Sequence, residues 1–235
     1  MSHSSIVDKE IAHFDALATH WWDENGPMRP LHMMNPPRAA WVLARIRKHL
    51  GGQGPILDVG CGAGLLAEAL AKDGFTVTGL DAGADVIAVA REHAEGQGLD
   101  LTYRQGTAEA LVAEGRTFPV VTALEIIEHV ADPEAFLASL KALLAPGGLL
   151  FLSTLNRTLK SYAVAKVGAE YVLRLLPVGT HDWQKFIKPE ELGRMCRQVG
   201  LRLEETAGLS YMPLSQSFKV SRDLSVNYLA MARAV

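Results

Sequence analysis

The sequence has few cysteines, no long apolar run and no excess of basic charge, and each absence excludes a class of protein. Two cysteines in 235 residues cannot build a disulfide framework or a cysteine-based zinc site. No uninterrupted apolar run reaches the ~20 residues that a membrane-spanning helix needs. The opening MSHSSIVDKE lacks the apolar core of a signal peptide. The net charge of -3 disfavours nucleic-acid binding, so we expect a cytoplasmic protein with no nucleic-acid partner.

Apolar residues make up 49% of the chain and charged residues 21%, which is enough for an ordinary hydrophobic core. From residue 55 onward, short apolar segments typical of strands alternate with helical patterns. The predicted parallel strands are PILDVG, FTVTGLD, LTYRQG, TFPVVTALE and LLFLSTL. This alternation indicates β-α-β units with right-handed crossovers. LRLEETAGLS and SVNYLAMARAV are expected to form an antiparallel C-terminal edge. The prediction is an α/β fold with a Rossmann-like doubly wound, mostly parallel sheet.

The chain is expected to have two parts. Residues 1–50 form an N-terminal helical cap, and residues 51–235 form the main domain, with an insertion at about 156–187 that interrupts the strand-helix rhythm. In the cap, Asn35 is a favourable N-cap and Pro36 fits the first helical position, so we expect a helix to begin there.

A glycine-rich turn, Asp58-Val-Gly60-Cys-Gly62-Ala-Gly64, separates the first strand from the first helix of the main domain. Glycines allow a ligand to approach the backbone, and the N-terminus of a helix favours an anionic group. The dinucleotide fingerprint fails because its third glycine would be Leu65. The order found here resembles that of class I S-adenosylmethionine (SAM) methyltransferases. Asp58 would then support the ammonium end of SAM, with Gly60 and Gly62 against the cofactor.

Two positions after later strands extend this cofactor site. Asp81 ends the second strand, where an acid accepts hydrogen bonds from ribose hydroxyls; the alternative is that Asp81 caps the helix beginning near Ala84. Ala108 follows the third strand, at a position that borders the adenine in this superfamily. An acid is common where this chain has Thr107, so that contact to the adenine amine is not expected.

The segment LEIIEHV follows the fourth strand and holds two carboxylates and an imidazole. If it turns as an α-helix, Glu125, Glu128 and His129 share one face. Three readings stay open. The three residues could bind a divalent ion such as Mg²⁺ or Zn²⁺, or His129, with Glu128, could act in proton transfer. The third reading is structural, with His129 and Asp132 only fixing the loop into the next helix.

Several longer stretches resemble the ubiquinone biosynthesis O-methyltransferase family, among them HWWDENGPMRPLHMMNPPR, LDVGCGAGLLAEALA, STLNRT, VGAEYVLRLLP and GTHDWQKFIKPEEL. The resemblance implies a class I SAM methyltransferase that methylates a hydroxyl of 2-polyprenyl-6-hydroxyphenol and of 3-demethylubiquinol. It implies SAM contacts at Arg38, Gly60, Asp81 and Leu124. Metal dependence within that family keeps the metal alternative open.

The substrate implied by the resemblance carries an isoprenoid chain, so contact with a membrane surface enters the prediction. In the insertion, Val164, Val167, Tyr171 and Leu175 recur at helical spacing among basic residues. Such a segment, 157–188, could lie on anionic lipid and place the protein peripherally at the inner membrane; an ordinary packed helix is the alternative. Two other functions remain: a methyltransferase for another small phenolic molecule, and a non-catalytic SAM-fold subunit of a biosynthetic complex.

Overall fold

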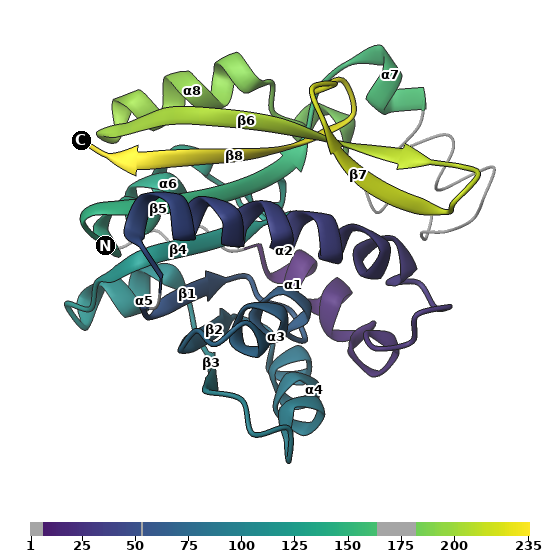
Figure 1. The fold of residues 1–235 in the computed structure, drawn as a ribbon, viewed down its shortest axis with the longest axis vertical. Coiled ribbons are helices and arrows are strands. Elements are labelled where there is room, and N and C mark those ends of the chain that lie inside the picture. Colours follow the sequence, from purple (N-terminus) through teal and green to yellow (C-terminus); the bar gives the residue numbers. More distant parts are fainter. Residues whose placement is uncertain (1–6, 53, 164–181) are drawn as a thin grey trace.

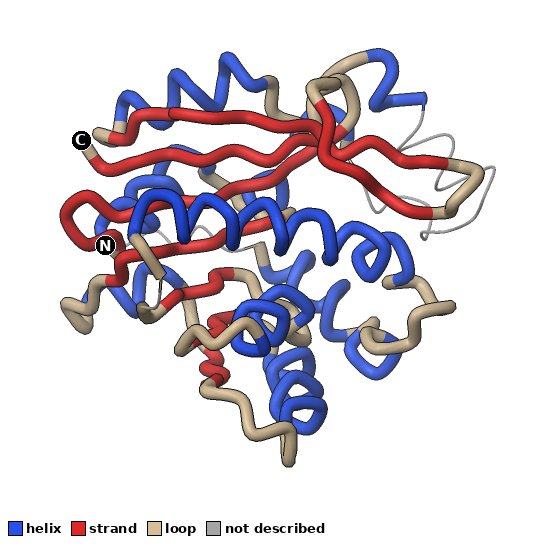
Figure 2. The backbone as a smooth tube through the Cα atoms, viewed as in Figure 1, coloured by secondary structure: helices blue, strands red, loops and turns tan. Residues whose placement is uncertain are grey.

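The computed structural model describes residues 7–52, 54–163 and 182–235. Its strands form a single sheet with helices on both sides (Figures 1 and 2). In chain order the described elements are α1 (Asp8–Asp15), the 3-10 helix η1 (Ala18–His20), α2 (Arg29–Leu50), β1 (Ile56–Val59), α3 (Leu65–Lys72), β2 (Val77–Asp81), α4 (Ala84–Ala94), β3 (Leu101–Gln105), α5 (Ala108–Ala113), β4 (Phe118–Leu124), η2 (Ile127–His129), α6 (Pro133–Ala142), β5 (Leu144–Leu155), α7 (Leu159–Ser161), η4 (Trp183–Lys185), α8 (Pro189–Gln198), β6 (Leu201–Met212), β7 (Ser217–Ser221) and β8 (Asn227–Ala234).

The sheet has the order β3-β2-β1-β4-β5-β8-β6-β7. The first five strands are parallel, and β8, β6 and β7 continue the sheet through antiparallel pairs. The chain order reverses between β1 and β4, which is where an open α/β sheet binds its ligand, outside the carboxyl ends of the strands. The predicted fold is confirmed, including its antiparallel C-terminal edge.

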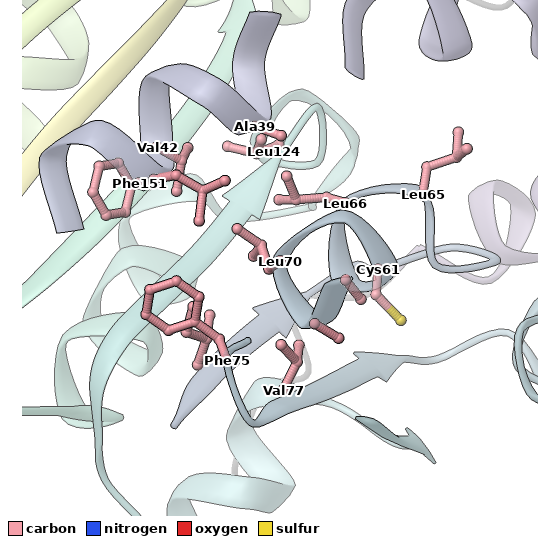
Figure 3. Close-up of a cluster of buried hydrophobic side chains, with 14 of the residues drawn as sticks. Ala39, Val42, Cys61, Leu65, Leu66, Leu70, Phe75, Val77, Leu124 and Phe151 are labelled. Atoms are coloured by element: carbon pink, nitrogen blue, oxygen red, sulfur yellow. The ribbon is translucent and has the colours of Figure 1, made fainter. Parts of the chain in front are cut away.

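Neighbouring residues of the central strands point to opposite faces and enter different cores. Ile56 joins the core that α2, α3 and α4 cover, whereas Leu57 joins the core under α5, α6 and α8. Both strand residues are completely buried. Figure 3 shows part of the first core, in which Val42 of α2, Leu70 of α3 and Phe151 of the sheet belong to one buried cluster. Packing of the two cores fixes the positions of the carboxyl ends of the strands, where the site lies.

The second helix of the cap begins earlier than predicted. It runs from Arg29 and contains Pro36 and Pro37 in its interior, so Asn35 is not an N-cap. Proline removes backbone hydrogen bonds but its φ is helical, and burial of Trp41, Val42 and Ile46 farther along the helix compensates. The position of Pro30 in the first turn agrees with the observed start.

The predicted insertion is described only at its two ends. Residues 164–181 lie outside the described residues, and with them Val164, Val167, Tyr171 and Leu175. No helix of the described residues is both long and apolar enough to cross a bilayer.

Candidate active site

A cavity of about 680 Å³ opens at the carboxyl ends of the parallel strands, beside the point where the strand order reverses. This volume is typical of small-molecule sites, which measure roughly 300–1,000 Å³. All the predicted site residues line it: Arg38, Asp58, Gly60, Gly62, Asp81, Ala108, Leu124, Glu125, Glu128 and His129. The structure therefore brings together residues that are up to 91 positions apart, as Arg38 and His129 are.

The glycine turn after β1 is packed too closely for side chains. A methyl group at Gly62 would overlap the indole of Trp21, and one at Gly64 would overlap the hydroxyl of Tyr103. Both glycines also have left-handed backbones, with φ of 53° and 95°. Tyr103 of β3 pairs with Gly79 of β2, and its ring lies across that glycine as well. The turn is thus held between the cap and the third strand.

Asp58, at the inner end of this turn, is a buried carboxyl with an unused acceptor. Its Oδ1 accepts a hydrogen bond from the Thr122 hydroxyl at 2.6 Å. Its Oδ2 is buried and has no partner among the described residues. Burial raises the pKa of Asp58 to about 7, against the opposing hydrogen bond from Thr122 and the charge of Arg38. A cationic group entering the cavity would satisfy this oxygen and favour the ionised form.

Asp81 holds the glycine turn to the end of β2. The backbone N–H of Gly62 donates to one of its oxygens and that of Gly83 to the other, both at 2.9 Å. Burial raises the pKa of Asp81, and these two hydrogen bonds oppose the rise. The first turn of α4 is capped by Asp15 of α1, which accepts from the N–H groups of Asp85 and Val86 at 3.2 Å. Asp81 therefore contacts the N-cap residue of α4 through Gly83, as the capping alternative expects, but it also binds Gly62 of the glycine turn, so capping is not its only contact.

Arg38 is buried without a carboxylate partner. Its Nε donates to Asn35 Oδ1 at 3.1 Å, and no acid of the described residues lies within ion-pair distance of its guanidinium. Burial lowers the pKa of Arg38, whereas the charges of Glu125 and Asp58 raise it. Because an unpaired buried cation is costly, this side chain suits an anionic ligand, which a guanidinium binds with two parallel hydrogen bonds.

Glu125 does not share a helical face with Glu128 and His129, which corrects the prediction. Its φ is 54°, in the left-handed region, and only Ile127–His129 forms a short 3-10 turn. Its carboxylate accepts a hydrogen bond from the hydroxyl of Ser153 at 2.6 Å. The i, i+3, i+4 spacing therefore does not apply here, because it requires a regular α-helix.

Glu128 and His129 face the cavity in different environments. Glu128 is buried, and burial together with the charge of Glu125 raises its pKa to about 7. His129 Nδ1 lies 3.0 Å from an oxygen of Glu10, and its ring packs edge-on against Phe14. Burial lowers the pKa of His129, but the hydrogen bond that its ring donates to Glu10 and the charges of nearby carboxylates raise the pKa overall. The same contact lowers the pKa of Glu10 to about 2.

Glu10 is the main site residue that the sequence did not predict. It lies on α1, 119 positions before its partner His129. It also forms an ion pair with Lys185, whose Nζ lies 3.3 Å from Glu10 Oε1. Nothing in the local pattern of the N-terminal helix distinguishes this glutamate from a solvated one. The contact between Glu10 and Nδ1 fixes the orientation of the His129 ring, and Nε2 is the ring nitrogen that Glu10 does not engage.

The three predicted metal ligands are not arranged as a metal site. Among residues 7–52, 54–163 and 182–235, no group of three or more His, Cys, Asp or Glu side chains is placed to hold a metal ion. Asp132, the residue of the structural alternative, caps α6 by accepting from the backbone N–H groups of Glu134 and Ala135 at 3.0 Å. His129 instead contacts Glu10 across the cavity.

Known proteins match this chain over almost its whole length. A family model described as a methyltransferase domain matches residues 34–206. A ubiquinone biosynthesis O-methyltransferase from Dinoroseobacter shibae is 51% identical and covers 97% of this chain and 96% of its own. One from Stutzerimonas stutzeri is 48% identical and covers 96% of this chain and 97% of its own.

Solved structures share the fold at lower identity. The magnesium protoporphyrin IX methyltransferase of Synechocystis PCC 6803 with bound SAH has a TM-score of 0.63 at 19% identity, covering 84% of this chain and 82% of its own. The [4+2]-cyclase SpnF has a TM-score of 0.59 at 16% identity, covering 83% and 80%. Since these two catalyse different reactions, the fold alone does not fix the activity. The near-complete relatives at about half identity do show the family: the chain belongs to the ubiquinone biosynthesis O-methyltransferases.

Proposed function

We propose that this chain transfers a methyl group from SAM to a phenolic hydroxyl of a polyprenylated ring in ubiquinone biosynthesis. The expected acceptors are 2-polyprenyl-6-hydroxyphenol and 3-demethylubiquinol. The observation that carries the proposal is a single cavity lined by two chemically different sets of residues. The first set is the glycine turn with Asp58 and Arg38, and the second set is Glu128 and His129.

The charged residues of the first set, Arg38 and Asp58, suit the amino-acid part of SAM. Arg38 would bind the carboxylate, and Asp58 Oδ2, which lacks a partner among the described residues, would accept from the ammonium. Asp81 would accept from the ribose hydroxyls, and Ala108 and Leu124 would contact the apolar parts of the cofactor. When bound, SAM supplies an activated methyl group on a sulfonium.

The second set of residues, Glu128 and His129, would take the proton of the acceptor hydroxyl. A phenol with a pKa near 10 is mostly protonated at neutral pH, so a base must take its proton as the methyl group arrives. His129 is oriented through Nδ1 by Glu10, which leaves Nε2 for the acceptor hydroxyl. Glu128, with its pKa raised to about 7, is a second proton acceptor beside it. Both lose their protons as pH rises, so turnover should increase from pH 6 to pH 8.

The placement of Glu125, Glu128 and His129 does not fit a three-ligand metal site. Methylation of a catechol analogue, with and without chelator and with added Mg²⁺ or Zn²⁺, measures metal dependence directly.

The decisive variants are Glu128→Ala and His129→Ala. Both should bind SAM with affinity close to that of the unchanged protein, because neither lies at the glycine turn, and both should lose turnover of a catechol substrate by about 100-fold or more. Calorimetry measures the binding and a methylation assay the rate. Wild-type rates in both variants would refute the assignment of the acceptor site. Failure of the unchanged protein to methylate any phenolic ring would favour a non-catalytic subunit.

A peripheral membrane contact through residues 157–188 is a further proposal, since an isoprenoid chain keeps the substrate in a bilayer. Three of its four described basic residues are already in ion pairs: Arg157 with Glu191, Lys160 with Asp223, and Lys185 with Glu10. Lys188 is the fourth, so the proposal depends mainly on the residues that the structure does not describe. Flotation with anionic liposomes tests it, and binding that survives replacement of this segment's basic residues would contradict it.

A further inference from the structure

The hairpin of β6 and β7 has one apolar face and one polar face. Its antiparallel pairs Leu209↔Val220 and Tyr211↔Phe218 alternate with Ser210↔Lys219. Because side chains alternate across a strand, the four apolar residues lie on one side of the hairpin. The rings of Tyr211 and Phe218 touch, with centroids 5.3 Å apart. This set of four residues, Leu209, Tyr211, Phe218 and Val220, is called the apolar hairpin face below.

The apolar hairpin face extends from the cavity to solvent. Leu209, Tyr211 and Phe218 line the same cavity as His129. Leu209 is buried, whereas Tyr211 is 42% exposed and Val220 39% exposed. The wall of the site therefore continues outward as an apolar surface that nothing in the described chain covers. Beyond it, in the turn of the hairpin, Leu214 is fully exposed.

Two other elements border this surface. The N-terminal part of α2 contributes Leu31, Met33 and Met34 to the cavity, and Arg29 donates to Gln216 in the hairpin turn at 2.7 Å. On the other side, the ion pair between Lys160 and Asp223 joins α7 to the end of the hairpin at 2.6 Å. Figure 1 shows α7 and β7 at the same end of the sheet.

Exposed apolar side chains are concentrated here. Five of the seven exposed large hydrophobic residues in the described chain belong to α7, to the residue after it or to the hairpin: Leu159, Tyr162, Tyr211, Leu214 and Val220. Scattered exposed apolar residues need no explanation, but a patch that continues a ligand cavity indicates an apolar ligand.

We propose that the apolar hairpin face is the subsite for the isoprenoid chain of the substrate. This inference rests on the proposed function, which places the aromatic ring at His129. An isoprenoid chain is apolar and has no hydrogen-bonding groups, so it gains affinity by covering apolar surface. The aromatic pair and the methionines of α2 offer such a surface directly beside the ring site, and flexible methionines adapt to a branched chain.

The test compares two catechol substrates that differ only in a soluble side chain of two isoprene units. The measured quantity is the ratio of kcat/KM for the tailed substrate to kcat/KM for the tailless one. Tyr211→Ser and Phe218→Ser should each lower this ratio about tenfold, the size of effect expected for lost apolar contacts in a pocket. Lys219→Ser is the matched control, because Lys219 lies on the opposite face of the same strand.

Leu214→Ser provides a variant whose folding is not in question, since Leu214 is fully exposed. It should lower the ratio only for tails longer than two units, which reach the hairpin turn. An unchanged ratio in all three variants would overturn the subsite. A loss seen only with substrate embedded in vesicles would also overturn it, because the hairpin would then contact lipid. If the unchanged protein methylates neither substrate, the proposed function itself fails; if it methylates both without preferring the tail, only the subsite fails.

Discussion

Asp58 is expected to couple SAM binding to pH. Its pKa is raised to about 7, so the carboxyl is largely neutral below pH 7 and ionised above it. The ammonium of SAM should bind the ionised form. SAM affinity is therefore expected to fall as pH drops below 7, by up to about tenfold per pH unit. Calorimetric titrations between pH 5.5 and 8.5 measure this dependence.

Asp58→Asn should lower SAM affinity at pH 8 and flatten the pH dependence. A ligand that lacks the amino-acid end, such as 5′-methylthioadenosine, should bind the unchanged protein with little pH dependence. An equally steep pH dependence in Asp58→Asn would assign the titration to another group. The raised pKa of Asp58 also affects stability. Because burial opposes ionisation of Asp58, the folded protein holds this proton more tightly than the unfolded chain does. The free energy of unfolding of the ligand-free protein should therefore fall as pH rises from about 4 to 7.

Glu10 should act on the reaction through His129. In Glu10→Ala the imidazole loses its 3.0 Å partner, and kcat for a catechol substrate should fall about 10- to 100-fold as the base loses its orientation. SAM affinity should stay within about twofold, because the glycine turn is untouched. Stopped-assay kinetics and calorimetry separate the two quantities.

Lys185→Ala is the matched control for Glu10→Ala. It removes the other partner of Glu10 and leaves the contact with His129 in place, so kcat should change little. Equal losses of kcat in the two variants would indicate that Glu10 only fastens α1 to the body of the protein.

At the scale of elements, Asn35 connects α2 to the start of α3, directly after the glycine turn. Its Nδ2 donates to the backbone oxygen of Leu65 at 2.7 Å, and its Oδ1 accepts from Arg38. Asn35→Ala should weaken SAM binding several-fold, because Arg38 loses its orienting contact. The variant should also lose about 1 kcal/mol of unfolding free energy for the missing hydrogen bond.

Asn25→Ala serves as a control for Asn35→Ala, since Asn25 is exposed in the loop before α2. Calorimetry and urea unfolding measure the two effects. A variant that loses stability but binds SAM normally would show that Asn35 braces the helix without orienting Arg38.

The places of β1 to β6 and of β8 along the chain could be predicted from the sequence because each of these strands carries its own apolar pattern. Among the elements that the sequence did not predict are α5 and β7. The helix α5 is short, although Thr107 caps it by accepting from the backbone N–H of Ala110 at 3.1 Å. The strand β7 is short and half exposed, and it is recognisable only through its pairing with β6. The capping residue Thr107 could have revealed α5, whereas β7 depends on its pairing with β6.

The site was predictable where one motif carries several residues. Asp58, Gly60 and Gly62 are neighbours in sequence, and all three line the cavity. The contact between Glu10 and His129 was not predictable, because it depends on how α1 packs. The left-handed conformation of Glu125 was also not predictable, since helical spacing assumes the very backbone that this residue breaks.

For the molecule as a whole, the cap and the main domain should unfold together. Trp21 and Trp41 of residues 1–50 share one hydrophobic core with Ile56 and Val77 of the sheet. We expect a single unfolding transition in urea, with fluorescence and circular dichroism coinciding. Two separate transitions would support a cap that is independently stable.

SAM should stabilise the whole molecule, because it would contact both parts. At 100 times its Kd, a ligand adds about 2.7 kcal/mol. For a domain of this size each kcal/mol shifts Tm by roughly 2–4 °C, so SAM should raise Tm by about 5–10 °C. Differential scanning fluorimetry measures the shift. A rise in Tm of the same size in Arg38→Ala would show that the cap does not take part in SAM binding.

The ring of Tyr103, which crosses Gly79 and reaches Gly64, constrains the order in which this sequence can change over evolution. At Gly79 the backbone is ordinary, and the ring of Tyr103 is the main obstacle to a methyl group, with Cys61 Sγ 3.0 Å away, so alanine becomes acceptable once residue 103 is smaller and the Cys61 side chain shifts slightly. At Gly64 the φ of 95° excludes alanine even then. Among related chains, positions 79 and 103 should therefore covary, with the change at 103 coming first, while position 64 stays glycine.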